Sequence, residues 1–521
     1  MKWDVAIVGA GMGGAALGYA LAMAGHRVVF LEKGVWTSRE EISDDPEASD
    51  PRVRLANGRW PNRISGWIDE APVSFYPPLG CGVGGSTLLY AGTLERFARD
   101  DFERHDDSGN SCWPISYDAL APFYEQAEEL FRVSGGPDSF YSGPAAPLRQ
   151  PPPMSRSDSY FFNVLQRNGL KPYRAHNAGD GRGGDERGSD GTPSGHRYDA
   201  RKVFIEPALA TGNATVIDQC TVERVDAGAD RVHRLTCQRQ GEEITVHARC
   251  YALAGGALST PFLLLRSTSR VWPTGVANGS GMVGRNLMFH VSDFVAVWQL
   301  GRKTMAGRSI LVRDFYKLGR ASLGVIQSTG LAADAHNVVH VLNMAIDAGS
   351  WKWLRPLKRF LHVPALLAAK LLGRATIFAT VLEDHPYKSN RVWSDPEQPD
   401  TICFEYTIQD ELRSRVREFR RLYKVAFRRH LMAILTPSIN LNFGHSCGTC
   451  RMGSDSSLSV LNSECRSHDL ENLYVVDGSI FPTSGGINPS LTIAANALRA
   501  GAIMSARLKA SSGSRPVDVE T

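Results

Sequence analysis

A glycine-rich turn between a short apolar run and an alanine-rich stretch constrains the fold of this chain more than any other feature. The predicted strand that contains the apolar run covers residues 4–9, and Gly9-Ala10-Gly11-Met12-Gly13-Gly14 continues directly from it. The stretch from Ala15 to Ala24 then has the composition of a helix. This order predicts a buried strand, a tight turn and a helix, which is the arrangement that binds a dinucleotide.

The glycines of this turn have separate predicted roles. Gly9 allows the tight turn, Gly11 lets the backbone approach a pyrophosphate, and Gly14 lets the helix pack against the strand. The N-terminus of the helix then faces the phosphates, where its positive end attracts their charge. We therefore predict that the cofactor lies against Gly9, Gly11, Met12, Gly13 and Gly14.

A second predicted strand, at residues 27–31, ends at Glu32. A carboxylate at this position accepts hydrogen bonds from the ribose hydroxyls of an adenosine and repels a 2′-phosphate, so Glu32 disfavours NADP. The motif leaves both NAD and FAD open, because the two cofactors present the same adenosine diphosphate to the turn.

A second glycine-rich stretch, at residues 80–90, has Arg96 and residues 101–103 behind it. It resembles the flavin-covering loop of the glucose–methanol–choline (GMC) oxidoreductases. Four glycines within residues 80–85 leave backbone N–H groups free to approach an anion or a flat ring, although a plain glycine-rich turn is the alternative. We predict that the cofactor also contacts Gly84, Gly85 and Ser86.

The C-terminal part of the chain resembles the GMC signature almost position by position. The matching stretches are residues 445–453, 472–479 and 482–493. Weaker matches lie in the middle of the chain, at residues 253–261, 283–287, 386 and 390–392. By this resemblance the cofactor is FAD.

The resemblance also implies the fold class. We expect an α/β protein with a Rossmann-like FAD-binding domain, of the type that GMC oxidoreductases share with p-hydroxybenzoate hydroxylase, and an α+β substrate domain on a mostly antiparallel sheet. The predicted FAD-binding domain is discontinuous and comprises residues 1–35, 75–110, 200–290 and 435–521. The predicted substrate domain and covering loops comprise residues 36–74, 111–199 and 291–434.

Further cofactor contacts are implied by the C-terminal stretches. Pro489 suits the start of an apolar helix at residues 490–504, whose positive end would point at Asn488 and, in this family, at the pyrimidine edge of the flavin. Asp477 follows a predicted strand and is expected near the ribityl or pyrophosphate group, through its side chain or the neighbouring backbone, with a plain turn residue as the alternative. The full set implied here is Val222, by a backbone contact to the adenine, with Asp477, Gly478, Asn488 and Pro489.

The covering loop also bears on how the flavin is held. Members of the family with covalently bound flavin carry a histidine in this loop, whereas this chain has Thr87, Leu88, Leu89 and Tyr90. We therefore predict non-covalent FAD.

Oxidation of an alcohol needs a base for the hydroxyl proton and an acceptor for the carbinol hydride. His445 opens the family signature at the position of the active-site histidine, and imidazole can serve as the base near neutral pH. Asn488 lies where the family has its second polar residue, and we interpret it as a hydrogen-bond partner of the substrate oxygen. His290 is a second, weaker candidate for the cavity, since an isolated histidine is more often structural. No metal ligands are predicted.

Nine cysteines, an odd number spread over the chain, exclude a disulfide framework. Cys447 and Cys450 have thiol–disulfide spacing without the surrounding fold that such a redox pair needs, so we predict two buried, inert thiols. The apolar run begins at Val5 with no charged leader or long apolar stretch before it. These features predict a reduced, cytoplasmic protein.

Three segments in the middle of the chain bear on partners. Residues 177–195 are nearly all turn formers and charged residues, which predicts either a lid or a solvated loop. Residues 411–433 predict an amphipathic helix with a solvated basic face. Residues 351–374 carry six Lys or Arg, no acid and two tryptophans, which fits a peripheral membrane contact, packed helices or an oligomer contact. No run of 18 apolar residues occurs, and the net charge of +4 excludes a general nucleic-acid surface.

The predicted function is FAD-dependent oxidation of an alcohol to a carbonyl, with hydride transfer to flavin N5 and electrons passed to oxygen or another acceptor. A sugar, a glycoside or another bulky hydroxyl compound is the favoured small-molecule substrate. Three alternatives remain: an enzyme similar to the hydroxynitrile lyases of the family, with no net redox chemistry; a protein in which the flavin is only structural; and a nicotinamide-dependent enzyme.

Overall fold

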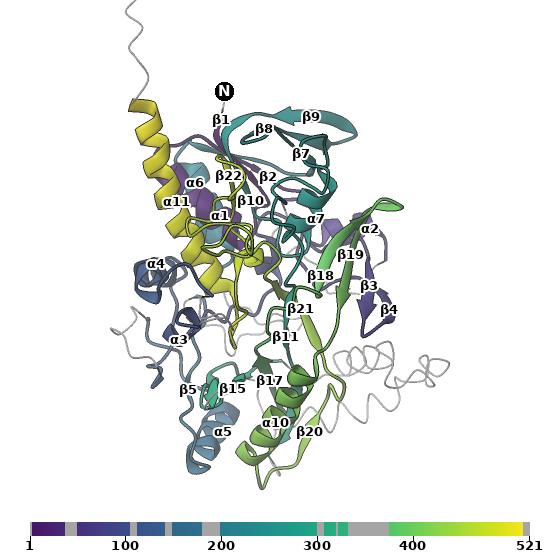
Figure 1. Cartoon of the computed structure of the whole chain (residues 1–521). Coiled ribbons are helices and arrows are strands. Elements are labelled where there is room, and N and C mark those ends of the chain that lie inside the picture. The colour runs from purple at the N-terminus through teal and green to yellow at the C-terminus, as the bar shows by residue number, and fades with distance from the viewer. Residues whose placement is uncertain are drawn as a thin grey trace, which may run out of the picture.

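Figure 1 shows the computed structural model of the chain. The predicted membrane or oligomer segment 351–374 lies outside the residues that the structure describes, and so does most of the loop 177–195. The described residues are 3–36, 49–104, 112–140, 148–179, 198–299, 307–318, 321–331 and 375–513.

A five-stranded parallel sheet carries the N-terminal turn. Its strand order is β22-β10-β1-β2-β6, and every neighbouring pair is parallel. The strands are short apolar runs, as expected of a parallel sheet that is covered on both faces. Their bounds are Trp3–Val8 (β1), Val28–Leu31 (β2), Ala214–Ile217 (β6), Ala248–Leu253 (β10) and Leu473–Val475 (β22).

Two long helices from opposite ends of the chain, α1 (Met12–Met23) and α11 (Ser490–Gly513), pack against each other beside this sheet (Figure 1). Glycines permit the close approach. A Cβ on Gly18 would lie 2.1 Å from the Phe30 ring of β2, and a Cβ on Gly501 would lie 2.7 Å from the Cβ of Ala20. Because α1 is enclosed by the sheet and α11, nearly all of its faces are apolar.

A large antiparallel sheet forms the other half of the molecule. Its strands follow the order β20-β12-β17-β16-β13-β5, and β11 joins β17 to β21. Every pair in it is antiparallel, as predicted for the substrate domain. The bounds are Tyr173–Arg174 (β5), Met288–Val291 (β11), Phe294–Trp298 (β12), Ile310–Val312 (β13), Gly324–Ser328 (β16), Ala375–Leu382 (β17), Met432–Ile434 (β20) and Leu441–Cys447 (β21).

The helix predicted at residues 411–433 ends earlier than expected. The observed helix α10 covers Asp410–Ala426, and its apolar face packs against the antiparallel sheet. Arg429 then has a φ of 73°, which a helix cannot contain, and Met432–Ile434 pairs with β12 as strand β20. Pairing at the sheet edge therefore replaces the last helical turns.

The remaining elements connect or extend these two halves. Strands β18, β19, β3 and β4 form a four-stranded sheet, β7 to β9 form an antiparallel meander, and β14 pairs with β15. The strands are Ile64–Ile68 (β3), Ala71–Phe75 (β4), Cys220–Ala227 (β7), Val232–Arg239 (β8), Glu242–Val246 (β9), Lys317–Leu318 (β14), Ala321–Ser322 (β15), Arg391–Asp395 (β18) and Gln398–Tyr406 (β19). The helices are Pro51–Ala56 (α2), Gly85–Leu88 (η2), Arg99–Phe102 (α3), Tyr117–Leu130 (α4), Arg156–Arg167 (α5), Arg201–Ile205 (η3), Glu206–Ala210 (α6), Ser259–Arg266 (α7) and Gly478–Ile480 (η5).

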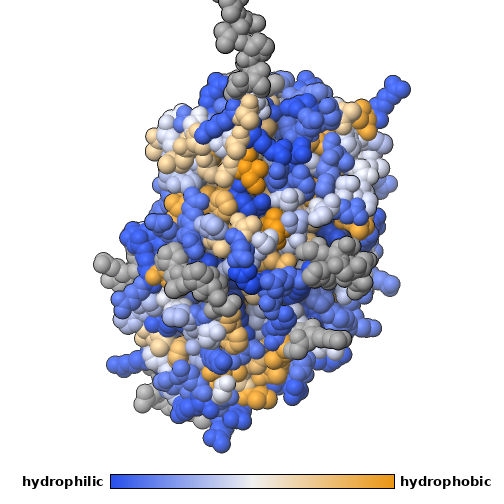
Figure 2. Space-filling model, turned by 60° about the vertical axis from the view of Figure 1, so that its left-hand side comes forward, coloured by the Kyte–Doolittle hydropathy of each residue, from blue (hydrophilic) through white to orange (hydrophobic). Residues whose placement is uncertain are grey.

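The face shown in Figure 2 is mainly hydrophilic, with hydrophobic residues in scattered positions. Within the described parts of the chain, every helix is too short or too polar to cross a lipid bilayer.

The two sheets follow the predicted domain division only in part. All five strands of the parallel sheet come from segments predicted for the FAD-binding domain. Strands β11 and β21 come from the same predicted segments but belong to the antiparallel sheet. The division into domains stays a prediction.

Candidate active site

A cavity of about 670 Å³ begins at the glycine turn after β1 and continues to the C-terminal signature. It lies at the carboxyl ends of the parallel strands, where α/β proteins bind their ligands. Among the predicted site residues, Gly14 and Gly84 do not line it. Those that do are Gly9, Gly11, Met12, Gly13, Glu32, Gly85, Ser86, Val222, His445, Asp477, Gly478, Asn488 and Pro489.

Three glycines of the N-terminal turn are required by the packing of the protein itself. Gly9 has a φ of 95°, and a Cβ there would lie 2.5 Å from the carbonyl oxygen of Ala254. A Cβ on Gly13 would lie 2.0 Å from the oxygen of Val476, and a Cβ on Gly14 would lie 2.1 Å from that of Gly9. Gly14 therefore serves the helix–strand contact, as its predicted role requires.

Gly11 differs from these three glycines. Its backbone has a φ of −79°, which any residue can adopt, and a Cβ there would meet only the Cα of Gly85, at 3.7 Å. The two glycine-rich turns thus meet at Gly11 and Gly85, and the space beside Gly11 belongs to the cavity. A side chain at Gly11 would fill the place where the backbone turn can cradle an anion.

Glu32 directly follows β2, at the wall of the cavity. Its carboxylate accepts hydrogen bonds from the backbone N–H groups of Ala10 and Gly34, each at 2.9 Å. Burial raises the pKa of this carboxyl, while the two N–H groups favour its charged form. The remaining lone pairs can accept hydrogen bonds from a ribose.

Asp477 uses its carboxylate to fix the backbone around the cavity. One oxygen accepts hydrogen bonds from Gly256 N (2.8 Å) and Thr260 Oγ1 (2.5 Å), and the other accepts from Ser479 N (2.8 Å). These contacts agree with a residue that shapes a turn. They also hold Gly478 at the wall of the cavity, so a cofactor contact through the neighbouring backbone remains open.

The two predicted catalytic residues line the same cavity. His445 lies on β21 as a partly buried residue, and Asn488 precedes α11 and is 9% exposed. The side-chain oxygen of Asn488 has no hydrogen-bond partner among the described residues. Because a buried amide without a partner is costly, this group is suited to bind a ligand.

The structure places His290, the weaker candidate from the sequence, in contact with His445. This residue is fully buried on β11, and its Nδ1 lies 3.0 Å from Nδ1 of His445. The pairing of β11 with β21 brings together two residues that are 155 positions apart. Burial, together with the neighbouring His290, lowers the pKa of His445 to about 3, so its imidazole is neutral at pH 7.

The described residues fit FAD. The paired glycine turns leave room for a pyrophosphate, Glu32 stands where the adenosine ribose is expected, and the unpartnered amide oxygen of Asn488 lies at the start of α11. In the covering loop, Thr87 donates a hydrogen bond to Gly84 O (2.6 Å) and accepts one from Ala200 N (2.9 Å), so its hydroxyl is committed within the protein.

Cys447 and Cys450 are free, buried thiols, and burial raises the pKa of both. Thiolates react and thiols do not, so neither residue is suited to redox exchange. In the described parts of the chain no three His, Cys, Asp or Glu side chains are grouped so as to hold a metal ion.

Comparison with known proteins agrees with this geometry. The sequence profiles of GMC oxidoreductases match residues 69–292 for the N-terminal part and 378–497 for the C-terminal part. The 2-methyl-1,2-propanediol dehydrogenase of Mycolicibacterium austroafricanum is 27% identical over 97% of this chain and 95% of its own length. The paromamine 6′-oxidase of Streptomyces fradiae is 29% identical over 95% of this chain and 90% of its own length.

Solved structures show the same fold. The crystal structure of pyridoxine 4-oxidase from Mesorbium loti has a TM-score of 0.66 and 19% identity, covering 96% of this chain and 99% of that protein. A fungal aryl-alcohol oxidase has a TM-score of 0.63 and 16% identity, covering 97% and 99%.

The fold and cavity therefore define an α/β oxidoreductase with a Rossmann-like dinucleotide-binding half. Within that class, the chain belongs to the GMC oxidoreductase family, whose members are FAD-dependent flavoproteins. The predicted family and fold class are both confirmed.

Proposed function

We propose that this protein oxidises an alcohol to a carbonyl with FAD, with His445 as the base and Asn488 as the group that orients the substrate oxygen. The observation that carries the proposal is that the neutral imidazole of His445 and the amide of Asn488, whose buried oxygen has no hydrogen-bond partner among the described residues, line one cavity. The same cavity contains the glycine turns that suit a pyrophosphate.

The reaction divides the two hydrogens of the alcohol between two acceptors. FAD, held by the two glycine turns and Glu32, would supply the acceptor for the carbinol hydride and its two electrons. His445 takes the hydroxyl proton, which a neutral imidazole can do at pH 7. The amide of Asn488 binds the oxygen and holds it beside the base without taking the proton itself.

We further propose non-covalent FAD, because the covering loop carries Thr87 to Tyr90 where covalent members have a histidine. The hydroxyl of Thr87 already makes two hydrogen bonds within the protein, which supports the same conclusion. Release of flavin into the supernatant on acid precipitation of the protein tests this directly, since a covalent flavin would stay in the pellet.

For the substrate we propose a sugar, a glycoside or another bulky hydroxyl compound. Relatives are named as a 2-methyl-1,2-propanediol dehydrogenase, a paromamine 6′-oxidase and a fructose dehydrogenase large subunit, which are enzymes for hydroxyl-rich compounds. The cavity wall combines aromatic rings and polar side chains, which suits such molecules. These residues are Trp60, Asn62, Tyr90, Thr93 and Asn442.

The test is anaerobic reduction of the bound flavin. The purified protein is mixed with 2-methyl-1,2-propanediol, paromamine, fructose, aryl alcohols, aliphatic alcohols and sterols, and the absorbance of the oxidised flavin is followed. Bleaching by one class supports the proposal, and readmitted air then distinguishes an oxidase from a dehydrogenase. A flavin that stays oxidised with every alcohol favours the lyase alternative, and absence of flavin contradicts the cofactor assignment.

Two variants test the residue roles. His445→Gln removes the base and should lower the reduction rate by about 10²- to 10⁴-fold while the flavin stays bound. Asn488→Ala should lower the rate and raise KM, because the substrate oxygen loses its partner. Unchanged kinetics in His445→Gln would contradict the assignment of the base.

A further inference from the structure

The contact between His290 and His445 determines which nitrogen of each ring carries a hydrogen. Nε2 of His290 lies 2.7 Å from the carbonyl oxygen of Gly485 and 3.2 Å from that of Ser484. Carbonyl oxygens only accept hydrogen bonds, so Nε2 of His290 must carry its hydrogen. A neutral imidazole has one such hydrogen, and Nδ1 of His290 is therefore an acceptor.

The same reasoning extends to His445. Its Nδ1 lies 3.0 Å from the acceptor Nδ1 of His290, so it must donate and must carry the hydrogen of its ring. The rings meet almost at right angles, at 89°, which lets the N–H of one ring point at the lone pair of the other. Nε2 of His445 is then left with a lone pair and no hydrogen, as a base requires.

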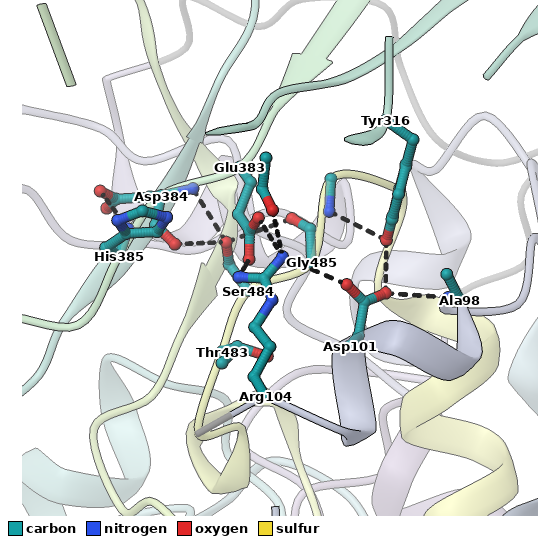
Figure 3. A network of polar contacts seen from close by, with 12 residues as sticks. Ala98, Asp101, Arg104, Tyr316, Glu383, Asp384, His385, Thr483, Ser484 and Gly485 are labelled. Carbon is teal, nitrogen blue, oxygen red and sulfur yellow. Dashed lines mark hydrogen bonds and ion pairs between the residues drawn. The ribbon is translucent and has the colours of Figure 1, made fainter. Parts of the chain in front are cut away.

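The carbonyls that fix His290 belong to a turn that is itself held by buried hydrogen bonds (Figure 3). The hydroxyl of Ser484 donates to Asp384 O at 2.9 Å and accepts from Asp384 N at 3.0 Å. The carboxylate of Asp384 accepts from the N–H of Phe289, directly before His290, at 3.0 Å. One residue thus holds both the backbone of His290 and the turn that bonds its ring.

A second connection reaches this turn from the opposite side. Gly486 N donates to the hydroxyl of Tyr316 at 3.2 Å. That hydroxyl in turn donates to the carboxylate of Asp101 at 2.6 Å, as Figure 3 shows. The turn therefore has bonds at Ser484 and at Gly486, on both sides of the carbonyl of Gly485. Its position cannot change without breaking buried hydrogen bonds, which are costly to lose.

Burial, not charge, keeps the ring of His290 neutral in the resting protein. Burial lowers the pKa of His290; the carboxylate of Glu383 acts in the opposite direction and is held in a bidentate ion pair with Arg104. Asp384 is occupied by hydrogen bonds from Phe289, His385 and Tyr406. The remaining titratable partner is His445 itself.

We propose that His290 is a positioning residue that fixes His445 as the Nδ1–H tautomer and so presents an unprotonated Nε2 to the alcohol. In the reaction, the alcohol O–H bond breaks and the proton forms a bond to Nε2 of His445. The hydrogen on Nδ1 stays donated to His290, which stabilises the resulting imidazolium. The inference rests on the proposed function, in which His445 is the base.

Three variants separate the two hydrogen bonds of His290. In His290→Gln the amide NH2 can take the place of Nε2 and keep the bond to Gly485, but no acceptor faces His445. In His290→Asn the amide oxygen can take the place of Nδ1 and keep an acceptor for His445. His290→Leu removes both groups. His26→Gln is the control, because His26 is also buried and bonds Ser505 away from the cavity.

The first readout needs no substrate: the nitrogen chemical shifts of 15N-histidine-labelled holoenzyme report the tautomer of His445. We expect Nδ1–H in the wild type, in His290→Asn and in His26→Gln, and appearance of the Nε2–H form in His290→Gln and His290→Leu. An Nε2–H tautomer in the wild type, or no change in His290→Leu, would overturn the inference.

The second readout is the rate of anaerobic flavin reduction by whichever alcohol of the panel bleaches the wild type. His290→Gln and His290→Leu should be slower by about 10²-fold or more, with KM and flavin content little changed, and His290→Asn should retain most of the rate. Equal loss in the Asn and Gln variants would indicate a merely structural residue and refute the proposal. If no alcohol bleaches the flavin, the proposed function fails, while the tautomer measurement still decides the role of His290.

Discussion

Substitution by alanine should have different effects at Gly13, where it should lower the stability of the protein, and at Gly11, where it should weaken the binding of FAD. At Gly13 an added Cβ would lie 2.0 Å from the carbonyl oxygen of Val476, whereas a carbon–oxygen contact needs about 3.3 Å. The start of α1 or the end of β22 would have to move by about 1 Å. Such overpacking costs about 1–3 kcal/mol, so Gly13→Ala should destabilise the protein by about 2 kcal/mol.

At Gly11 the protein itself leaves room for the added methyl group. The new Cβ would meet only the Cα of Gly85, at 3.7 Å, and the φ of −79° suits alanine. Loss of a glycine N-cap costs at most about 1 kcal/mol. The methyl group would, however, occupy the space assigned to the pyrophosphate. We expect Gly11→Ala to raise the dissociation constant of FAD at least tenfold, or about 1.4 kcal/mol.

The assay combines urea denaturation, with and without added FAD, and titration of FAD into deflavinated protein. Gly25→Ala is the control for FAD affinity: its Cβ would touch nothing and it lies outside the cavity, although its φ of 89° strains an alanine by about 1–2 kcal/mol. If Gly11→Ala bound FAD as tightly as the wild type, the phosphates could not lie against this turn. If Gly13→Ala were as stable as the wild type, the close contact with Val476 would be refuted.

Three further predictions follow from buried groups. Arg96→Met should destabilise the protein by about 3–5 kcal/mol in urea denaturation, because Glu128 loses its buried partner at 2.5 Å; a change below about 1 kcal/mol would contradict this. Since the pKa of His445 is lowered to about 3, the rate of flavin reduction should stay constant from about pH 8 to about pH 5. A loss of rate centred near pH 6.5, about the ordinary histidine pKa, would contradict the lowered pKa of His445. A thiol reagent should quickly modify at most Cys112 and Cys250, which are not fully buried, and should reach all nine cysteines only after unfolding.

The lowered pKa of His445 also predicts that the protein becomes less stable as the pH falls. In the unfolded chain, His445 binds a proton below about pH 6.5, whereas in the folded protein it stays neutral to a much lower pH. The unfolded state then holds more protons, so the contribution of His445 to stability is lost as the pH falls below that value.

The site was largely predictable where it depends on residues close together in the sequence. The turn at 9–14, the carboxylate of Glu32 and the stretch around Asn488 each have a local pattern, and the structure places them around one cavity. The contact of His290 with His445 has no such pattern, because it arises from pairing of strands that are distant in the chain.

The fold shows the same division. The strand–turn–helix at the N-terminus is visible in local apolar runs and glycines, and β1 and α1 lie within a few residues of their predicted positions. The end of α10 at Ala426 was not predicted, because the residues that follow gain their hydrogen bonds from β12, more than a hundred residues earlier. Tertiary pairing there outweighs the helical pattern of residues 427–433.

The parallel sheet has a consequence for how the protein is made. Its strands come from residues 3–8, 28–31, 214–217, 248–253 and 473–475, and α1 rests on the last helix of the chain. During synthesis from the N-terminus, the first glycine turn leaves the ribosome long before β22 and α11 exist. The nascent chain therefore carries an unfinished sheet edge through most of translation, and the cavity gains its C-terminal wall only at the final stage of folding.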